Sequence, residues 1–483
     1  MPMHIWKKRY DARKRILNKK DRPMELKDIK SVYFLGAGGI GMSALVRYFL
    51  NEGKFVAGYD RTPSPLTGKL IEEGARLHFE ENVELVPAEC RLPESTLVIY
   101  TPAIPDDHKE WELFRNGGFT IKKRAEVLGI ITRDRRGVCA AGTHGKTTTS
   151  TMTAHLLHQS AVDCAAFLGG ISKNYKSNLI LSDKSDLVVI EADEYDRSFL
   201  HLEPYIATIT SADPDHLDIY GNKENYLEAF AQFTRKIRPG GYLIIHEGLE
   251  VVPRTNDSVT TFTYGRESGD FHAENIRIGG GTIVFDYVSP WQRIDDIELG
   301  VPVSINIENG IASMAMAEIC GATAEELKRG MKSFAGADRR FDFHIKEDNL
   351  VLLSDYAHHP DEVKACAKSI KELYSDRKVT AIFQPHLYSR TADFYKEFAQ
   401  SLSLFDKVIL VDIYPAREKP MPGVTSKLIF DCLAPDVEKM LCSRADVLKV
   451  IEEEKDDIEV LVSLGAGDIE NDVPEMENIL RNR

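Results

Sequence analysis

The sequence predicts an α/β fold in three domains. Short β-rich runs alternate with helical patterns along most of the chain, as they do in domains built on parallel sheets. This alternation begins three times, near residues 31, 138 and 350, and 483 residues have room for two to four domains of about 100–200 residues. We therefore expect a basic leader followed by three domains, with the boundaries 1–23, 24–136, 137–338 and 339–483.

The charge of the chain is unevenly distributed. The whole sequence has 61 Lys and Arg against 75 Asp and Glu, a net charge of −14. Residues 1–23 hold nine basic and two acidic side chains, so this leader carries +7 and the remainder −21. An acidic chain is a poor general nucleic-acid binder, because phosphate neutralisation needs a basic face. The leader lacks the apolar core of a secretory signal, and we expect a poorly ordered tail rather than an RNA-contacting arm.

Apolar runs and cysteines indicate the compartment. The longest apolar stretches, such as 187–190 and 408–411, are far shorter than the roughly 20 residues of a membrane helix, so we expect no membrane insertion. The seven cysteines are scattered without a CxxC pair, which is typical of reduced thiols in a cytoplasmic protein.

The expected elements follow in order from the apolar runs and their flanking signals. Short apolar runs predict buried parallel strands, and longer stretches with one apolar face predict helices. Between residues 251 and 299 the pattern becomes short and polar, which predicts an antiparallel excursion within the middle domain. The expected strands are Ser31–Leu35, Phe55–Gly58, Val138–Ala141, Leu187–Ile190, Ile206–Thr210, Leu350–Leu353, Val379–Phe383, Lys407–Val411 and Glu459–Leu464, and the expected helices are Ile40–Leu50 and Thr147–His158.

A glycine-rich loop follows the first strand. Gly36, Gly38 and Gly41 fit GxGxxG between a strand and a helix. The first glycine permits a tight turn, the second a close approach to a diphosphate, and the third close packing of helix on strand. Asp60 lies 19 residues after Gly41, where a ribose-binding acid is expected. The pattern fits NAD, FAD or the diphosphate of a UDP-sugar, and a turn without any nucleotide is the alternative.

A second phosphate loop opens the middle domain. Residues 140–147 fit the Walker A pattern with Ala140 in place of the first glycine. Backbone N–H groups from Gly142 to Thr147 can form an anion nest, Lys146 can reach the β- and γ-phosphates, and Thr147 can bind Mg²⁺. This loop predicts ATP binding. A nicotinamide oxidoreductase built on the first loop alone would leave Lys146 unexplained, and a non-enzymatic ATP-regulated protein is the other alternative.

Acidic residues follow two buried strands of the middle domain. Glu191 opens an acidic cluster that extends to Asp196, at the position where P-loop enzymes hold their metal. His216 follows the next strand among three carboxylates, and imidazole with carboxylates suits a second Mg²⁺. The alternatives are a solvated acidic loop and a histidine packed in the core. The carboxylates around His216 are Asp213, Asp215 and Asp218.

An ordered series of motifs resembles the Mur ligase family of ATP-dependent amide-forming enzymes. The resemblance extends from about Lys30 to Ile469 and implies a Rossmann-like N-terminal domain for a UDP-sugar, a P-loop ATPase-like central domain and a Rossmann-like C-terminal domain that closes over the amino acid and ATP. The matching segments are Gly142–Thr148, Glu191–Glu194, Asp215–Gly221, Asp338–Phe341, Asp355–Pro360 and Gln384–Thr391.

Four further segments resemble one branch of the family. They are Gly36–Ser43, Thr101–Pro105, Arg124–Glu126 and Gly465–Ile469. This branch joins L-alanine to the lactyl carboxylate of UDP-N-acetylmuramate through an acyl phosphate, forming ADP, in peptidoglycan precursor synthesis. Tyr195 is instead similar to the recycling branch, which adds a tripeptide to the same sugar nucleotide. The implied partners are UDP-N-acetylmuramate and L-alanine, with ATP and Mg²⁺, and we expect a monomer or weak homodimer.

The resemblance also implies the roles of individual residues. Asn306 and Asn309 could alternatively cap a helix that starts near Ile311. The chain departs from the family where Ile305 replaces a usual histidine and Leu387 a usual arginine. The implied catalytic residues are Lys146, Glu191, His216, Arg340, His358 and Arg390; the ATP-binding residues are Gly142, Thr143, His144, Gly145, Lys146, Thr147, Thr148, Asn306, Asn309 and Asp355; the UDP-sugar-binding residues are Gly36, Gly38, Gly39, Ile40, Gly41, Asp60, Thr101 and Arg124; and the metal ligands are Thr147, Glu191 and His216.

Overall fold

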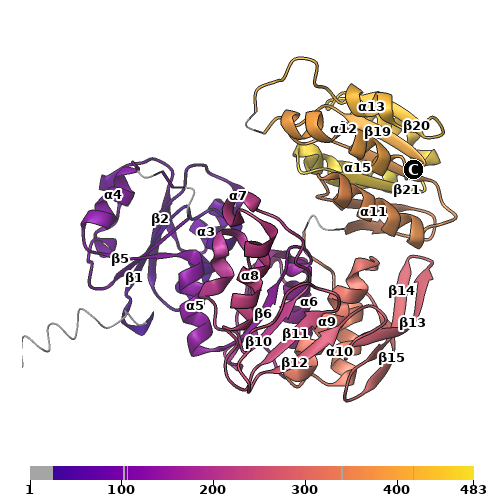
Figure 1. The fold of residues 1–483 in the computed structure, drawn as a ribbon. Coiled ribbons are helices and arrows are strands. Elements are labelled where there is room, and N and C mark those ends of the chain that lie inside the picture. Colours follow the sequence, from indigo (N-terminus) through magenta and orange to yellow (C-terminus); the bar gives the residue numbers. More distant parts are fainter. Residues whose placement is uncertain (1–25, 102–103, 106, 339–340, 417) are drawn as a thin grey trace, which may run out of the picture. The chain divides into compact units, whose positions relative to one another are not determined.

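The computed structural model describes residues 26–101, 104–105, 107–338, 341–416 and 418–483. The predictions for the basic leader and for Arg340 therefore lie outside the described residues. The chain divides into two compact units, one ending at Ile131 and the other beginning at Thr132. Figure 1 shows the ribbon coloured along the sequence, with the elements labelled.

The first unit is a five-stranded parallel sheet in the order β3-β2-β1-β4-β5. The strand order reverses between β1 and β4, and the crevice at such a switch point is where open α/β sheets bind ligands. Tyr33 and Leu35 of β1 pack with Phe114 of α4 on one face, whereas Phe34 meets Phe49 of α2 on the other. The strands are β1 Ser31–Leu35, β2 Phe55–Tyr59, β3 Arg76–His78, β4 Thr96–Tyr100 and β5 Thr120–Lys123, and the helices are α2 Ile40–Asn51, α3 Pro65–Glu72, α4 Lys109–Asn116 and α5 Arg124–Asp134.

The central part of the second unit is a seven-stranded sheet in the order β12-β11-β10-β6-β9-β7-β8. All neighbours are parallel except β7 and β8, and β6, which leads into the P-loop, lies in the middle. The strands are β6 Arg136–Ala141, β7 Ala165–Ser172, β8 Ser177–Ile180, β9 Leu187–Ala192, β10 Ile206–Ile209, β11 Tyr242–His246 and β12 Thr260–Tyr264, and the helices are α6 Lys146–His158, α7 Leu217–Tyr220, α8 Lys223–Thr234, α9 Ile305–Ile319 and α10 Ala324–Ser333.

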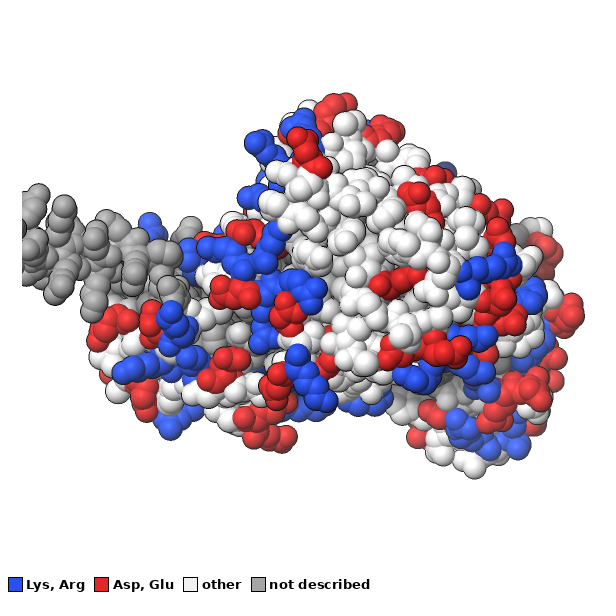
Figure 2. Space-filling view, turned by 90° about the horizontal axis from the view of Figure 1, so that it is seen from below, with Lys and Arg blue, Asp and Glu red and all other residues white. Residues whose placement is uncertain are grey.

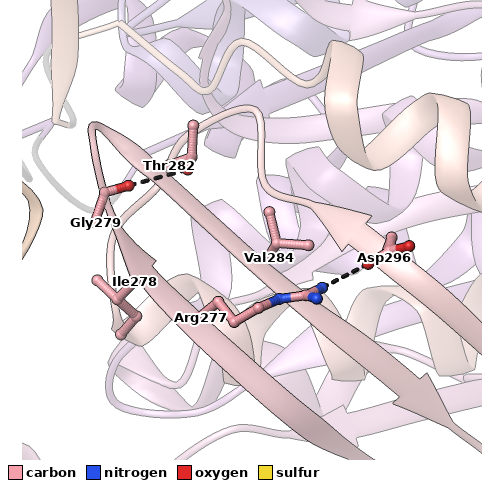
Figure 3. Close-up of a pocket in the computed structure, with 6 residues that line it drawn as sticks. All are labelled: Arg277, Ile278, Gly279, Thr282, Val284 and Asp296. Atoms are coloured by element: carbon pink, nitrogen blue, oxygen red, sulfur yellow. Dashed lines mark hydrogen bonds and ion pairs between the residues drawn. The ribbon is translucent and has the colours of Figure 1, made fainter.

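A separate antiparallel sheet follows, formed by β13 His272–Gly279, β14 Thr282–Val288 and β15 Arg293–Glu298. The predicted antiparallel excursion is confirmed for these strands but is wrong for β12, which pairs in parallel with β11. The connection over residues 247–259 is long enough for the crossover of about a dozen residues that parallel pairing requires. Figure 3 shows a shallow pocket on the antiparallel sheet, where Arg277 forms an ion pair with Asp296 at 2.6 Å.

The C-terminal part is a six-stranded sheet in the order β16-β17-β21-β18-β19-β20, parallel except for the edge strand β16. Helices α11, α12 and α13 pack on one face, and α14 and α15 on the other. All four strands predicted here are present to within a residue or two. The strands are β16 Asp342–Lys346, β17 Val351–Asp355, β18 Val379–Phe383, β19 Lys407–Val411, β20 Glu438–Cys442 and β21 Val460–Leu464, and the helices are α11 Pro360–Leu373, α12 Tyr388–Leu402, α13 Lys427–Cys432, α14 Val447–Glu454 and α15 Val473–Arg481.

The surface carries charges of both signs, and the cysteines are unpaired. On the face seen in Figure 2, basic and acidic side chains are interspersed around a broad area without charged residues. Within the described ranges, no helix has the length and apolar character needed to cross a bilayer. All seven cysteines are free thiols, and five of them are buried.

One buried histidine in the phosphate-loop helix should make stability depend on pH. His155 of α6 is 5% exposed, and its ring nitrogens lie 2.8 Å from the Tyr175 hydroxyl and 2.9 Å from the Ser333 hydroxyl. Burial lowers the pKa of His155 to about 4. The unfolded chain therefore binds more protons than the folded one between about pH 4 and pH 6.5, and stability falls as the pH falls through that window.

We expect His155→Gln to flatten this dependence, because it removes the titrating ring. The change in slope is at most ~1.4 kcal/mol per pH unit. Thermal melts from about pH 4.5 to pH 6.5 measure it, with the exposed His201→Gln as the matched control. Equal slopes in wild type and His155→Gln would contradict the prediction.

Candidate active site

The first glycine loop lies against the ends of neighbouring strands in the first unit. Gly36 has a φ of +89°, and its N–H donates to the carbonyl of Tyr59 at 2.8 Å. A Cβ at Gly36 would lie 2.4 Å from Thr101 Cγ2, so only glycine permits this approach. The structure therefore brings Thr101, a predicted UDP-sugar residue, onto the loop.

Asp60 contacts the loop itself. Its Oδ2 accepts a hydrogen bond from the Gly38 N–H at 2.6 Å, and its Oδ1 accepts one from the Thr62 N–H at 3.2 Å. Asp60 therefore fixes the loop in this structure, and a ribose contact stays a prediction.

The third glycine of the motif makes room for a side chain. A Cβ at Gly41 would lie 2.5 Å from Arg124 Nε. The guanidinium therefore lies beside Gly41, where the motif predicted close packing of the helix on the strand. Gly39 stands at the N-cap of α2, and the following Ile40 is 39% exposed. The Arg124 side chain thus lies beside the first turn of α2.

The P-loop of the second unit is hydrogen-bonded to the segment that follows β10. Thr143 N–H donates to the Ser211 carbonyl at 3.2 Å, and His144 N–H donates to Ser211 Oγ at 2.7 Å. These two N–H groups are therefore already hydrogen-bonded within the protein, so fewer N–H groups than predicted can bind an anion. The first-turn N–H groups of α6, which include Lys146, Thr147 and Thr148, have no acceptor within the helix and are available to an anion.

Lys146 is held by an acid that the sequence analysis did not select. Its Nζ donates to the carbonyls of Gly142 at 2.7 Å and Thr143 at 3.1 Å, and forms a 2.7 Å ion pair with Glu194 Oε2. The Glu194 side chain is 2% exposed. Burial raises the pKa of Glu194, and the adjacent Lys146 charge opposes that rise. The acidic cluster 191–196 is the sequence signal for this residue, but it predicts a metal ligand at Glu191 and no partner for Lys146.

Glu191 lies in a space provided by glycine. A Cβ at Gly169 of β7 would lie 1.9 Å from Glu191 Oε2, and one at Gly170 would lie 3.5 Å from Thr147 Cγ2. Within the described residues, Glu191 Oε2 is buried and has no hydrogen-bond partner. A buried carboxylate oxygen left open in this way fits the coordination of a cation. No sequence motif indicates the Gly169–Gly170 pair.

His216 lies near two carboxylates. Its Nε2 is 3.6 Å from Asp215 Oδ2 and 3.9 Å from Glu194 Oε1, and its φ is +52°. Nowhere in the described ranges do three His, Cys, Asp or Glu residues come close enough to hold a metal by themselves. Mg²⁺ commonly takes only one or two protein ligands beside water and phosphate, so Thr147 with Glu191 fits one ion, and His216 stays the predicted ligand of a second.

The two asparagines link α9 to the P-loop. Asn309 Oδ1 accepts a hydrogen bond from Thr149 Oγ1 at 3.2 Å and would lie 2.7 Å from a Cβ at Gly145. Asn309 Nδ2 in turn donates to Asn306 Oδ1 at 3.1 Å. Helix α9 begins at Ile305, so both asparagines lie within it, and the alternative that they cap a helix near Ile311 is wrong.

The C-terminal part gathers its predicted residues at the carboxyl ends of β17 and β18. Both Asp355 oxygens accept backbone N–H groups, so its ribose role stays a prediction. The rings of His358 and His386 are 6.0 Å apart. Burial, then the charges of Arg390 and His358, lower the pKa of His386. Arg390 Nη1 and His386 Nδ1 are buried without hydrogen-bond partners among the described residues.

Comparison with known proteins supplies the family. Models of the Mur ligase family match residues 31–136 (family, catalytic domain), 140–317 (middle domain) and 339–469 (glutamate ligase domain). The chain is 64% identical over 460 residues to a UDP-N-acetylmuramate–L-alanine ligase of Phocaeicola vulgatus, covering 95% of this chain and 100% of the relative. The chain belongs to the Mur ligase family. The predicted resemblance is thus confirmed.

Other relatives of this Mur ligase agree. It is 58% identical to a UDP-N-acetylmuramate–L-alanine ligase of Parabacteroides distasonis, over 95% of the chain and 98% of the relative. The crystal structure of a UDP-N-acetylmuramate-alanine ligase from Thermotoga maritima has a TM-score of 0.76 at 26% identity, covering 94% of this chain and 99% of that one. A murein peptide ligase from Psychrobacter arcticus, at 21% identity and a TM-score of 0.62 over 94% and 99% of the chains, shares the fold.

The glycine pair of β7 offers a matched test of this Mur ligase site. Gly169→Ala should displace the Glu191 carboxylate, because the new Cβ would lie 1.9 Å from its oxygen. We expect up to about 100-fold lower ATP-dependent turnover. Gly170→Ala, whose Cβ would meet Thr147 only at 3.5 Å, should stay within about twofold of wild type. Steady-state phosphate release measures both, and equal activities would contradict the prediction.

Proposed function

We propose that this Mur ligase joins L-alanine to the lactyl carboxylate of UDP-N-acetylmuramate, with conversion of ATP to ADP and phosphate. The observation that carries the proposal is the 64% identity over 95% of the chain to a relative with that name. The P-loop with Lys146 and the open carboxylate oxygen of Glu191 support an ATP-dependent reaction. The nucleotide cosubstrates and the free cysteines support the predicted cytoplasmic location.

The chemistry has two steps. The lactyl carboxylate attacks the γ-phosphorus of ATP, so that an acyl phosphate forms and ADP leaves. The amine of L-alanine then attacks the acyl carbon, and the tetrahedral intermediate expels phosphate and loses a proton to leave the amide. A carboxylate is a poor electrophile, and phosphorylation converts one of its oxygens into a good leaving group. Negative charge on the transferring group requires cationic surroundings, which Lys146 and the start of α6 provide.

The proposed reaction also uses Mg²⁺ as a cofactor. Thr147 and Glu191 are the residues that would hold one ion and His216 a second, and the buried open oxygen of Glu191 supports the role of the first pair. The ion would neutralise charge on the phosphates during transfer.

The remaining predicted residues keep their proposed roles. The first glycine loop with Asp60, Thr101 and Arg124 would hold the sugar nucleotide. Asn306, Asn309 and Asp355 would bind the nucleoside of ATP. His358 and Arg390 would face the amino acid and the reacting carboxylate, and the unpartnered Arg390 Nη1 supports an anionic ligand there. Arg340 would contact the γ-phosphate. The monomer or weak homodimer stays a prediction.

Phosphate release tests the function directly. Purified protein is given ATP, Mg²⁺ and UDP-N-acetylmuramate together with L-alanine, other small amino acids, or the tripeptide that the recycling branch would add. We expect release with L-alanine. Release only with the tripeptide would favour recycling, and no release with any acceptor would refute ligation.

Lys146→Ala separates catalysis from sugar-nucleotide binding. We expect turnover to fall at least about 1,000-fold, because the charge at the transferring phosphoryl group is lost. UDP-N-acetylmuramate should still bind, because its proposed site lies on the first glycine loop. Calorimetric titration with the sugar nucleotide measures this. Wild-type turnover in the variant, or loss of UDP-sugar binding, would contradict the assignment.

A further inference from the structure

One buried carboxylate faces two of the residues assigned to phosphoryl transfer. Glu194 follows β9 and stands at the N-cap of the short 3-10 helix Tyr195–His201. Its Oε2 lies 2.7 Å from Lys146 Nζ, and its Oε1 lies 3.9 Å from His216 Nε2. A single 2% exposed side chain thus stands between the P-loop cation and a proposed metal ligand.

The backbone around Glu194 is fixed. Its carbonyl accepts hydrogen bonds from the Tyr220 hydroxyl at 2.6 Å and from the Arg197 N–H at 2.9 Å. Tyr220 is 2% exposed, and the Arg197 guanidinium lies over its ring at 5.0 Å. Glu194 is therefore held in a defined position within the site and is not a mobile surface acid.

The next residue contacts the histidine. The Tyr195 ring meets the His216 ring edge-on, with centroids 5.1 Å apart. His216 is consequently flanked by an aromatic ring and faced by the carboxylates of Glu194 and Asp215.

The charge of Glu194 works against nucleotide affinity. A carboxylate in contact with Lys146 offsets the attraction of that cation for a phosphate, and it repels the phosphate itself. The interaction is strengthened by burial, where screening is weak. Electrostatics therefore oppose a role for Glu194 in tightening the binding of metal-free ATP, whereas a role in orienting Lys146 and His216 agrees with both contacts.

We propose that Glu194 is a positioning residue, which orients Lys146 and His216 for phosphoryl transfer while weakening the binding of metal-free ATP. This inference rests on the proposed ATP-dependent ligation. The Lys146 ammonium has three oxygen neighbours, namely the carbonyls of Gly142 and Thr143, to which it donates hydrogen bonds, and the carboxylate of Glu194, with which it forms an ion pair. Loss of the carboxylate removes the only charged one of these three.

The test is Glu194→Gln, which keeps the shape of the side chain and removes its charge. Binding of metal-free ATP, measured by displacement of a fluorescent nucleotide in EDTA, should tighten about threefold to tenfold. Turnover at saturating substrates should fall at least about tenfold, and the KM for UDP-N-acetylmuramate should stay within about twofold. If Glu194 had only a structural role, the substitution would instead weaken the binding of both ATP and UDP-N-acetylmuramate and would lower the thermal stability.

Two further variants complete the experiment. Glu194→Asp keeps the charge but withdraws the carboxylate, so metal-free ATP affinity should stay near wild type while turnover still falls. If Glu194→Gln does not fold, this divergence between affinity and turnover decides the question. Asp183→Asn, an exposed acid with no assigned role, is the control and should match wild type in both measurements.

The outcomes are distinct. Wild-type turnover in Glu194→Gln, or weakened metal-free ATP binding in that variant, would overturn the proposal. If wild-type protein releases no phosphate with any acceptor, the proposed ligation fails. The ATP-binding measurements then still decide whether Glu194 opposes phosphate at Lys146.

Discussion

Gly142 lies so close to the end of β10 that a Cβ there would stand 2.1 Å from Thr210 Oγ1. Its φ of +144° would also strain any other residue. This contact, with the two hydrogen bonds that Ser211 accepts, fixes the P-loop at the carboxyl edge of the sheet. The direction of α6 and the reach of Lys146 depend on it, because both begin where the loop ends. The same position of the loop places Lys146 in contact with Glu194.

Close approach at glycine recurs at three of the proposed ligand positions. Gly36 admits Thr101, Gly41 admits the Arg124 guanidinium, and Gly169 admits the Glu191 carboxylate. In each case a side chain from another element occupies the volume that a Cβ would fill. These positions are therefore built from glycine backbone against which side chains from other elements pack closely. This makes them sensitive to the smallest possible substitution.

Electrostatics explain how an acidic protein can use anionic substrates. Beyond the leader the chain carries −21, yet ATP and a UDP-sugar are themselves negatively charged. Attraction must come from local groups, namely Lys146, Arg390 and the first turn of α6. Two acids of the same cluster differ in their surroundings: Glu191 keeps an open buried oxygen, whereas Glu194 is paired with Lys146. Local pairing rather than net charge decides what each can do.

The sequence by itself determined the α/β class, the predicted strands and the P-loop, because these follow from local apolar runs and from glycine spacing. The family followed from motifs in the same way. Only the tertiary structure decided that Glu194 faces Lys146, because that ion pair joins two different loops of the chain. It also decided that Asp60 holds Gly38 and that β12 pairs in parallel. These contacts join residues far apart along the chain, and no local pattern specifies which partner a side chain will meet.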